Sequence, residues 1–109
     1  MTWHSLYPMP DPARGRPADR APAPWPDVAS ADPLAEVART FVLRLRHAMG
    51  DLSVRAVASE AGVSHVTLLR VLNGQVWPDL ATITRLEIAL DADLHSSRAV
   101  RKAPPSVDL

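Results

Sequence analysis

A short polar cluster near the middle of the chain carries the side chains best suited to recognise another molecule. Its members fall within one stretch of sequence: Ser64, His65, Val66, Thr67 and Arg70. They offer hydroxyl, imidazole and guanidinium groups for hydrogen bonding, together with methyl groups. Arg reads guanine through two hydrogen bonds to O6 and N7, and methyl-bearing side chains fit the methyl group of thymine. The cluster therefore predicts contact with the edges of DNA bases.

Other roles stay open for each of these residues. For Arg70 a base contact is favoured, and the alternatives are a phosphate contact or a solvated surface charge. For His65 a contact with a base or with a phosphate is expected. Val66 is as well suited to packing at the edge of a helix as to touching thymine. Leu69 is expected to be exposed, which needs no functional explanation for a single side chain.

Two short helices joined by a tight turn are predicted to hold this cluster. The first is expected to follow Ser53, its N-terminal cap, and to end at residue 61, and the second is expected over residues 65–72, with Ser64 as its cap. Gly62 lies in the turn between them. Two helices joined by three or four residues that include Gly form a helix-turn-helix, in which the start of the second helix enters the major groove.

Two longer helices are predicted around this pair. Asp32 and Pro33 begin the first, expected to reach residue 49, and Asp79 caps the last, expected over 80–90. Apolar residues recur at three- and four-residue steps and are expected to face the core: Leu34, Val37, Ala38, Phe41, Val42, Leu45, Ala48, Met49, Val54, Val57, Ala58, Ala61, Leu68, Val71, Leu72, Leu80, Ile83, Leu86, Ala89 and Leu90. Leu94 could add a final turn. The predicted fold is all-α, a compact domain of four to five helices.

The ends of the chain differ from this central part. Of the 11 prolines, 7 lie before Val28, so residues 1–31 are expected to form a Pro-rich disordered arm. Residues 32–95 are expected to form the folded domain, and residues 96–109 a loose C-terminal tail. Because Trp25 lies in the arm, its packing cannot be assumed from the sequence.

Composition argues against several other functions. The chain has no Cys, and its 4 His residues are scattered, so neither a metal site nor a cofactor is expected. Paired catalytic acids, nucleophile–base sets and phosphate-binding glycine loops are missing, so no enzyme is expected. No apolar run approaches the ~20 residues that cross a bilayer, and no secretory signal is recognisable, which predicts a cytoplasmic protein without membrane contact. The formal net charge of zero requires a DNA-binding chain to gather its Arg residues on one face.

The chain resembles the phage-repressor and Cro type of helix-turn-helix protein, the XRE family, over about residues 34–94. The features that carry the resemblance are Leu52-Ser53, Val57-Ala58, Gly62-Val63-Ser64, Asn73-Gly74, Pro78 and Ala89-Leu90, in this order and spacing. The resemblance implies that the helix after Ser64 reads double-stranded DNA with the cluster described above. It also implies phosphate contacts at the start of the preceding helix and in the loop that follows: Ser53, Val54, Arg55, Asn73, Gly74 and Gln75.

The chain departs from the family pattern at three positions. Val54 stands where the family often has a phosphate-binding Gln, and Leu72 and His47 stand where it often has a Glu–Arg pair. An apolar contact between Leu72 and His47 is expected to replace that pair. Such proteins usually dimerise, but this chain has no heptad segment, so a homodimer and a monomer both stay open.

A sequence-specific transcriptional regulator, acting as a repressor, is the leading functional hypothesis. The alternative is an adaptor or antitoxin-like subunit that holds a protein partner through the aromatic residues of its arm, Trp3, Tyr7 and Trp25. Trp77 has two interpretations: a lid over the core between the last two helices, or an indole donor to a phosphate.

Overall fold

A computed structural model describes residues 15–95 of the chain; residues 1–14 and 96–109, including Trp3, Tyr7 and the whole of the predicted tail, lie outside the described part. Within residues 15–95 the fold is all-helical and contains no strand. The elements are the 3₁₀ turn η2 (Pro17–Arg20) and the helices α1 (Pro33–Met49), α2 (Val54–Ala61), α3 (His65–Leu72) and α4 (Leu80–Leu90). The four predicted helices are thus confirmed, with the predicted bounds, and no fifth helix follows within the described residues.

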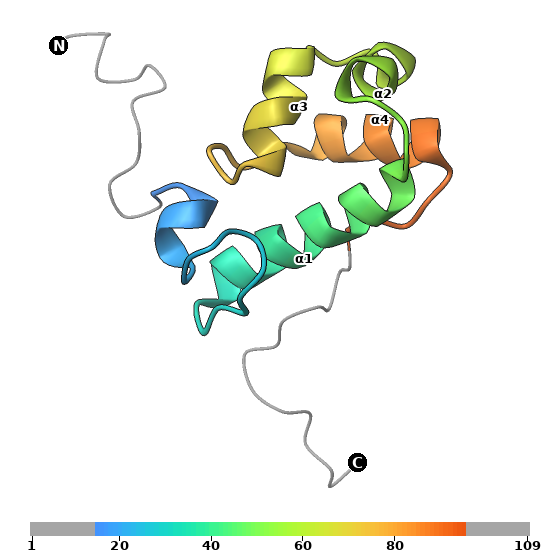
Figure 1. Ribbon diagram of the computed structural model, residues 1–109. Coiled ribbons are helices and arrows are strands. Elements are labelled where there is room, and N and C mark those ends of the chain that lie inside the picture. The colour runs from blue at the N-terminus through green and yellow to red at the C-terminus, as the bar shows by residue number, and fades with distance from the viewer. Residues whose placement is uncertain (1–14, 96–109) are drawn as a thin grey trace, which may run out of the picture.

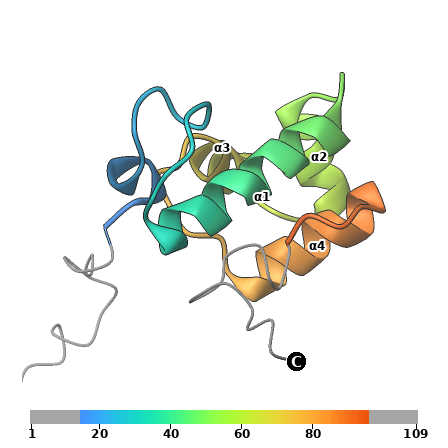
Figure 2. The ribbon, with the colours of Figure 1, turned by 90° about the horizontal axis from the view of Figure 1, so that it is seen from below.

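The helices surround one core (Figures 1 and 2). α2 packs against both α3 and α4, whereas α1 contacts α3 and the η2 turn. α1 runs beneath α2 and α3 in Figure 1, and the η2 turn lies close to the loop that follows α3. The helix pair of the predicted helix-turn-helix is therefore supported from below by the other two helices.

Side-chain caps explain where the helices begin. Ser53 Oγ accepts a hydrogen bond from the N–H of Ala56 at 3.0 Å, and Asp79 Oδ1 accepts one from Thr82 at 2.7 Å. Asp32 Oδ1 does the same for Leu34 at 2.9 Å, with Pro33 in the first helical position. α2 ends at Gly62, whose φ of +72° lies in the left-handed region that favours glycine.

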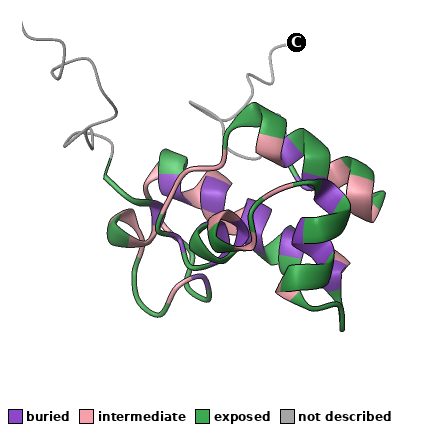
Figure 3. Ribbon diagram, turned by 90° about the horizontal axis from the view of Figure 1, so that it is seen from above, coloured by how far each residue is buried: buried purple, intermediate pink, exposed green. Residues whose placement is uncertain are grey.

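The core contains most of the apolar residues that the periodicity places there (Figure 3). Phe41, Leu45, Leu68 and Leu86 are almost completely buried. The prediction is wrong at the first turns of two helices, since Leu34 is 53% exposed and Leu80 is 75% exposed. Both side chains have the correct helical spacing, but no element within residues 15–95 covers them there.

The described part of the predicted arm, residues 15–31, does not match the expectation of disorder. We call this segment the strap. It has the η2 turn as its one regular element, yet Pro17 and Pro26 are fully buried and Trp25 packs against the core. Proline content correctly predicted the near absence of regular structure, but the strap is held by side-chain contacts with distant residues instead.

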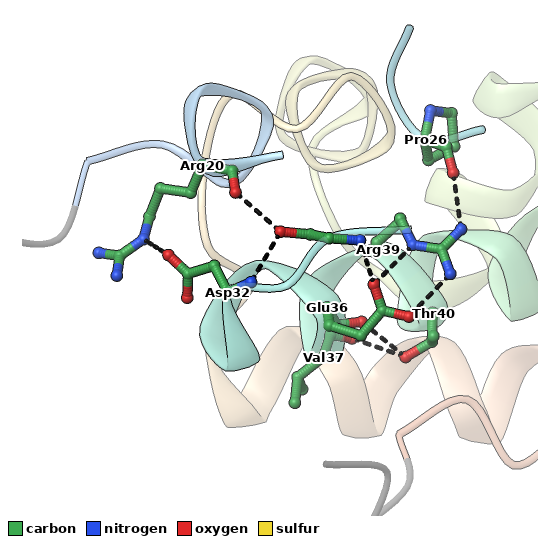
Figure 4. Close-up of polar contacts among 8 residues, drawn as sticks. Arg20, Pro26, Asp32, Glu36, Val37, Arg39 and Thr40 are labelled. Carbon is green, nitrogen blue, oxygen red and sulfur yellow. Dashed lines mark hydrogen bonds and ion pairs between the residues drawn. The ribbon is translucent and has the colours of Figure 1, made fainter. Parts of the chain in front are cut away.

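Polar contacts fasten the strap to the start of α1 (Figure 4). Arg20 pairs with Asp32, and Arg39 both pairs with Glu36 at 2.8 Å and donates to the carbonyl of Pro26 at 3.0 Å. The N–H of Ser30 donates to Glu36 Oε1 at 2.9 Å. The Arg20 guanidinium lowers the pKa of Asp32, and the Arg39 guanidinium lowers the pKa of Glu36, because each stabilises the ionised carboxylate. Two of the acids that join the strap to α1, Asp32 and Glu36, are therefore stabilised in their ionised form.

Candidate nucleic-acid interface

The outer face of α3 presents the predicted cluster to solvent. Val66, Leu69 and Arg70 are exposed, and His65 and Thr67 are partly exposed, while Leu68, Val71 and Leu72 on the opposite face are buried. The expected exposure of Leu69 is confirmed at 41%. No hydrogen bond or ion pair in the described part of the chain engages the Arg70 guanidinium, so it is able to reach a ligand.

Ser64 has a structural task at the start of this helix. Its Oγ accepts hydrogen bonds from the N–H groups of Val66 at 3.1 Å and Thr67 at 3.4 Å. The hydroxyl hydrogen is not used in these bonds, and the residue is exposed. Ser64 can therefore cap α3 and still donate one hydrogen bond outward.

The start of α2 offers a second set of groups. Ser53 and Arg55 are both exposed, as a phosphate contact requires, whereas Val54 is half-buried and packs against the core. No described contact engages the Arg55 side chain. Because backbone N–H groups at a helix N-terminus attract anions, the position of Val54 can contribute through its main chain alone.

The loop after α3 is arranged differently from the expectation for a phosphate-binding segment. The N–H groups of Asn73, Gly74 and Gln75 donate to the carbonyls of Leu69, Val71 and Arg70, respectively, and so terminate the helix. Gly74 is buried, and its carbonyl accepts from the N–H of Ala18 in the strap at 2.9 Å. Only Asn73 and Gln75 expose their side chains, so any contact with phosphate from this loop has to use those amides.

Three Arg residues on α1 and α4 make hydrogen bonds that serve the fold. Arg44 donates to the carbonyl of Leu94 at 3.4 Å, and Arg46 donates to the carbonyl of Leu72 at 3.5 Å. Arg85, which the sequence analysis did not single out, donates from α4 to the carbonyl of Gly62 at 3.3 Å. Arg85 thus supports the turn that leads into α3. Its place off the apolar stripe of α4 gave no sign of this role, because the contact joins residues far apart in the sequence.

Leu72 and His47 differ in their exposure to solvent. Leu72 is buried, but His47 is exposed. The Leu72 carbonyl accepts from the Trp25 indole N–H at 3.0 Å and from Arg46. Donors from the strap and from α1 thus meet at the last carbonyl of α3.

Trp77 lies half-buried in the loop before α4. Its indole N–H donates to the carbonyl of Gly15 at 2.7 Å, and its ring lines an apolar hollow of about 200 Å³ together with Phe41 and Ile83. Both observations fit the interpretation of Trp77 as a lid over the core. The indole hydrogen that a phosphate contact would need is already engaged.

Residues 15–95 contain neither a candidate metal-binding group nor a candidate membrane-spanning helix. Across residues 15–95, no group of three His, Asp or Glu residues is placed to hold a metal ion. In the same part of the chain, no helix combines the length and the apolar character needed to cross a bilayer.

Comparison with known families matches residues 44–95 to a family described as helix-turn-helix. Residues 44–95 form a helix-turn-helix domain of the XRE type. The helix-turn-helix match includes α2, the turn, α3 and α4, and it covers just under half of the chain. Domains of this type occur in DNA-binding transcription regulators and are not typically enzymatic. No curated protein and no solved structure matches the chain at a significant level.

Proposed function

We propose that this protein is a transcriptional repressor that binds double-stranded DNA in a sequence-specific manner, with α3 in the major groove. The observation that supports the proposal is the outward row of His65, Val66 and Arg70 on a helix whose other face is buried. Its N-terminal end is exposed, which is the end that contacts base edges in this motif.

Different side chains contact the bases and the phosphates of the bound DNA. Arg70 and His65 read base edges, Val66 and Thr67 contact thymine methyl groups, and Ser64 positions the helix start against the duplex. Ser53 and Arg55 at the start of α2, and Asn73 and Gln75 in the loop after α3, contact phosphates. With a net charge of zero for the whole chain, affinity depends on these local contacts rather than on general attraction to DNA.

The described fold weakens the case for an adaptor that captures partners through its arm. Trp25 was one of three aromatic residues on which that hypothesis depended, and its indole is bound to Leu72 inside the molecule. The other two, Trp3 and Tyr7, lie outside the described residues. We therefore do not propose the adaptor function.

Selection from a library of fragments of the source genome tests the proposal. The full chain should enrich a small set of fragments that share one sequence, and the preference should persist when the salt concentration is raised. The length and symmetry of that sequence report whether one copy binds or two, because half-sites of a dimer lie about 34 Å apart. Equal binding to all fragments would refute sequence-specific recognition.

A reporter assay separates repression from activation. When the selected sequence overlaps a promoter, the protein should lower expression of the reporter gene. Increased expression would refute the repressor role while leaving DNA recognition intact.

A further inference from the structure

The strap holds the C-terminal end of α3, and it lies entirely before the residues that match the helix-turn-helix family, which begin at Arg44. The Trp25 indole N–H donates to the carbonyl of Leu72 at 3.0 Å, and the Ala18 N–H donates to the carbonyl of Gly74 at 2.9 Å. We propose that the strap is a clamp that fixes α3 in its DNA-binding orientation, with Trp25 as the positioning residue. This inference rests on the proposed function of α3 in reading DNA.

The clamp packs directly on the backbone at the end of α3. A Cβ atom added to Gly74 would lie 2.7 Å from Trp25 Cε2 and 2.8 Å from the Cβ of Ala18, closer than side chains approach one another. Gly74 also has a φ of +68°, which favours glycine. The absence of a side chain at residue 74 thus allows the strap to seal the helix end, and α3 cannot tilt outward without displacing Trp25.

The other end of the clamp is anchored on α1. The strap reaches α1 through the pairing of Arg20 with Asp32 and through the hydrogen bond from Arg39 to the Pro26 carbonyl. Trp77 adds a third attachment from the loop before α4, since its indole binds Gly15. The strap therefore connects the longest helix of the domain to both ends of the segment between α3 and α4.

This connection matters because α3 is short. It has 8 residues, whereas isolated helices need about 12–15 residues to be even marginally stable in water. Its orientation therefore depends on the elements that hold it. A helix held in place before it meets DNA loses less conformational freedom on binding, which raises affinity.

Substituting Trp25 by Phe in the full chain tests the clamp, because Phe keeps an aromatic ring but lacks the indole N–H. We expect W25F to remain folded by circular dichroism and to bind the selected DNA sequence about three- to tenfold more weakly. Amide hydrogen exchange at Val71, Leu72 and Asn73 should become faster. Leu86→Val in α4 is the matched control: Leu86 is fully buried, so the change costs some core packing away from the clamp, and it should leave DNA affinity unchanged.

A second variant, W25A, removes the ring as well and should weaken binding further. Unchanged affinity in W25F and W25A, with faster exchange at the end of α3, would overturn the clamp. Equal losses of affinity in W25F and L86V would also overturn it, because Trp25 would then act only through overall stability. If the unsubstituted chain selects no DNA sequence, both the proposed function and the clamp are refuted. This result is obtained before any variant is compared, so it is distinct from a failure of the clamp alone.

Discussion

Replacing Arg70 by Ala tests the reading of DNA by α3 most directly. The Arg70 side chain is exposed and no described contact engages it, so its removal should change the free energy of unfolding by less than about 0.5 kcal/mol. A bidentate contact with guanine is worth about 1–3 kcal/mol of discrimination. Since 1.4 kcal/mol corresponds to a factor of ten, affinity for the selected sequence should fall about 5- to 150-fold.

Fluorescence anisotropy with two labelled duplexes separates base reading from phosphate binding. One duplex carries the selected sequence, and the other carries a substitution at the base pair assigned to Arg70. A base contact predicts that R70A binds both duplexes equally, so that the preference at this one position disappears. A phosphate contact predicts instead a uniform loss and a salt dependence whose slope falls by about 0.9.

Arg44→Ala provides the control with the same change in net charge. Arg44 lies on α1 and donates to the Leu94 carbonyl rather than flanking the outer face of α3. R44A should therefore retain the preference of the unsubstituted chain. If R44A and R70A lowered affinity equally for every duplex, the assignment of Arg70 to base reading would be refuted.

Three further predictions concern the scaffold. Gly74→Ala should lower the melting temperature more than Gly50→Ala, because both positions have positive φ but only Gly74 lies against the strap, and equal losses would contradict the tight packing there. Acid should destabilise the protein, because the pKa values of Asp32, Glu36 and Glu87 are lowered in the fold. The stabilisation that these carboxylates provide is complete above about pH 4.5 and is lost as the pH falls through their folded pKa values. A urea midpoint that stayed constant from pH 6 to pH 3 would contradict this prediction. Asp79→Ala should cost about 0.5–2 kcal/mol in urea unfolding through loss of the α4 cap, whereas the same change at exposed Asp93, which makes no cap, should cost much less.

The sequence predicted the helices well because their signals are local. Ser53, Ser64 and Asp79 each cap the helix that follows, and glycine follows two of the helices at their ends. The same local signals placed the polar cluster on the outer face of α3. The assignment of those residues to DNA contacts remains a prediction.

Contacts between distant residues were beyond the reach of the sequence pattern. Periodicity identified the face on which Leu34 and Leu80 lie, but it could not show that nothing packs over those first turns. Proline content likewise gave no sign that Trp25 would bind Leu72, 47 positions further along the chain. The loop at Gly74 was therefore expected to face DNA, although the strap covers it.

The extent of α1 also determines which fragment of this chain can fold by itself. The family match begins at Arg44, but Ala35, Ala38, Phe41 and Val42 precede it and are all buried. A fragment cut at the family boundary would begin in the middle of a helix and leave the partners of these side chains facing water. Such a fragment should aggregate or stay unfolded, whereas one that starts near Gly15 should behave as a cooperative unit.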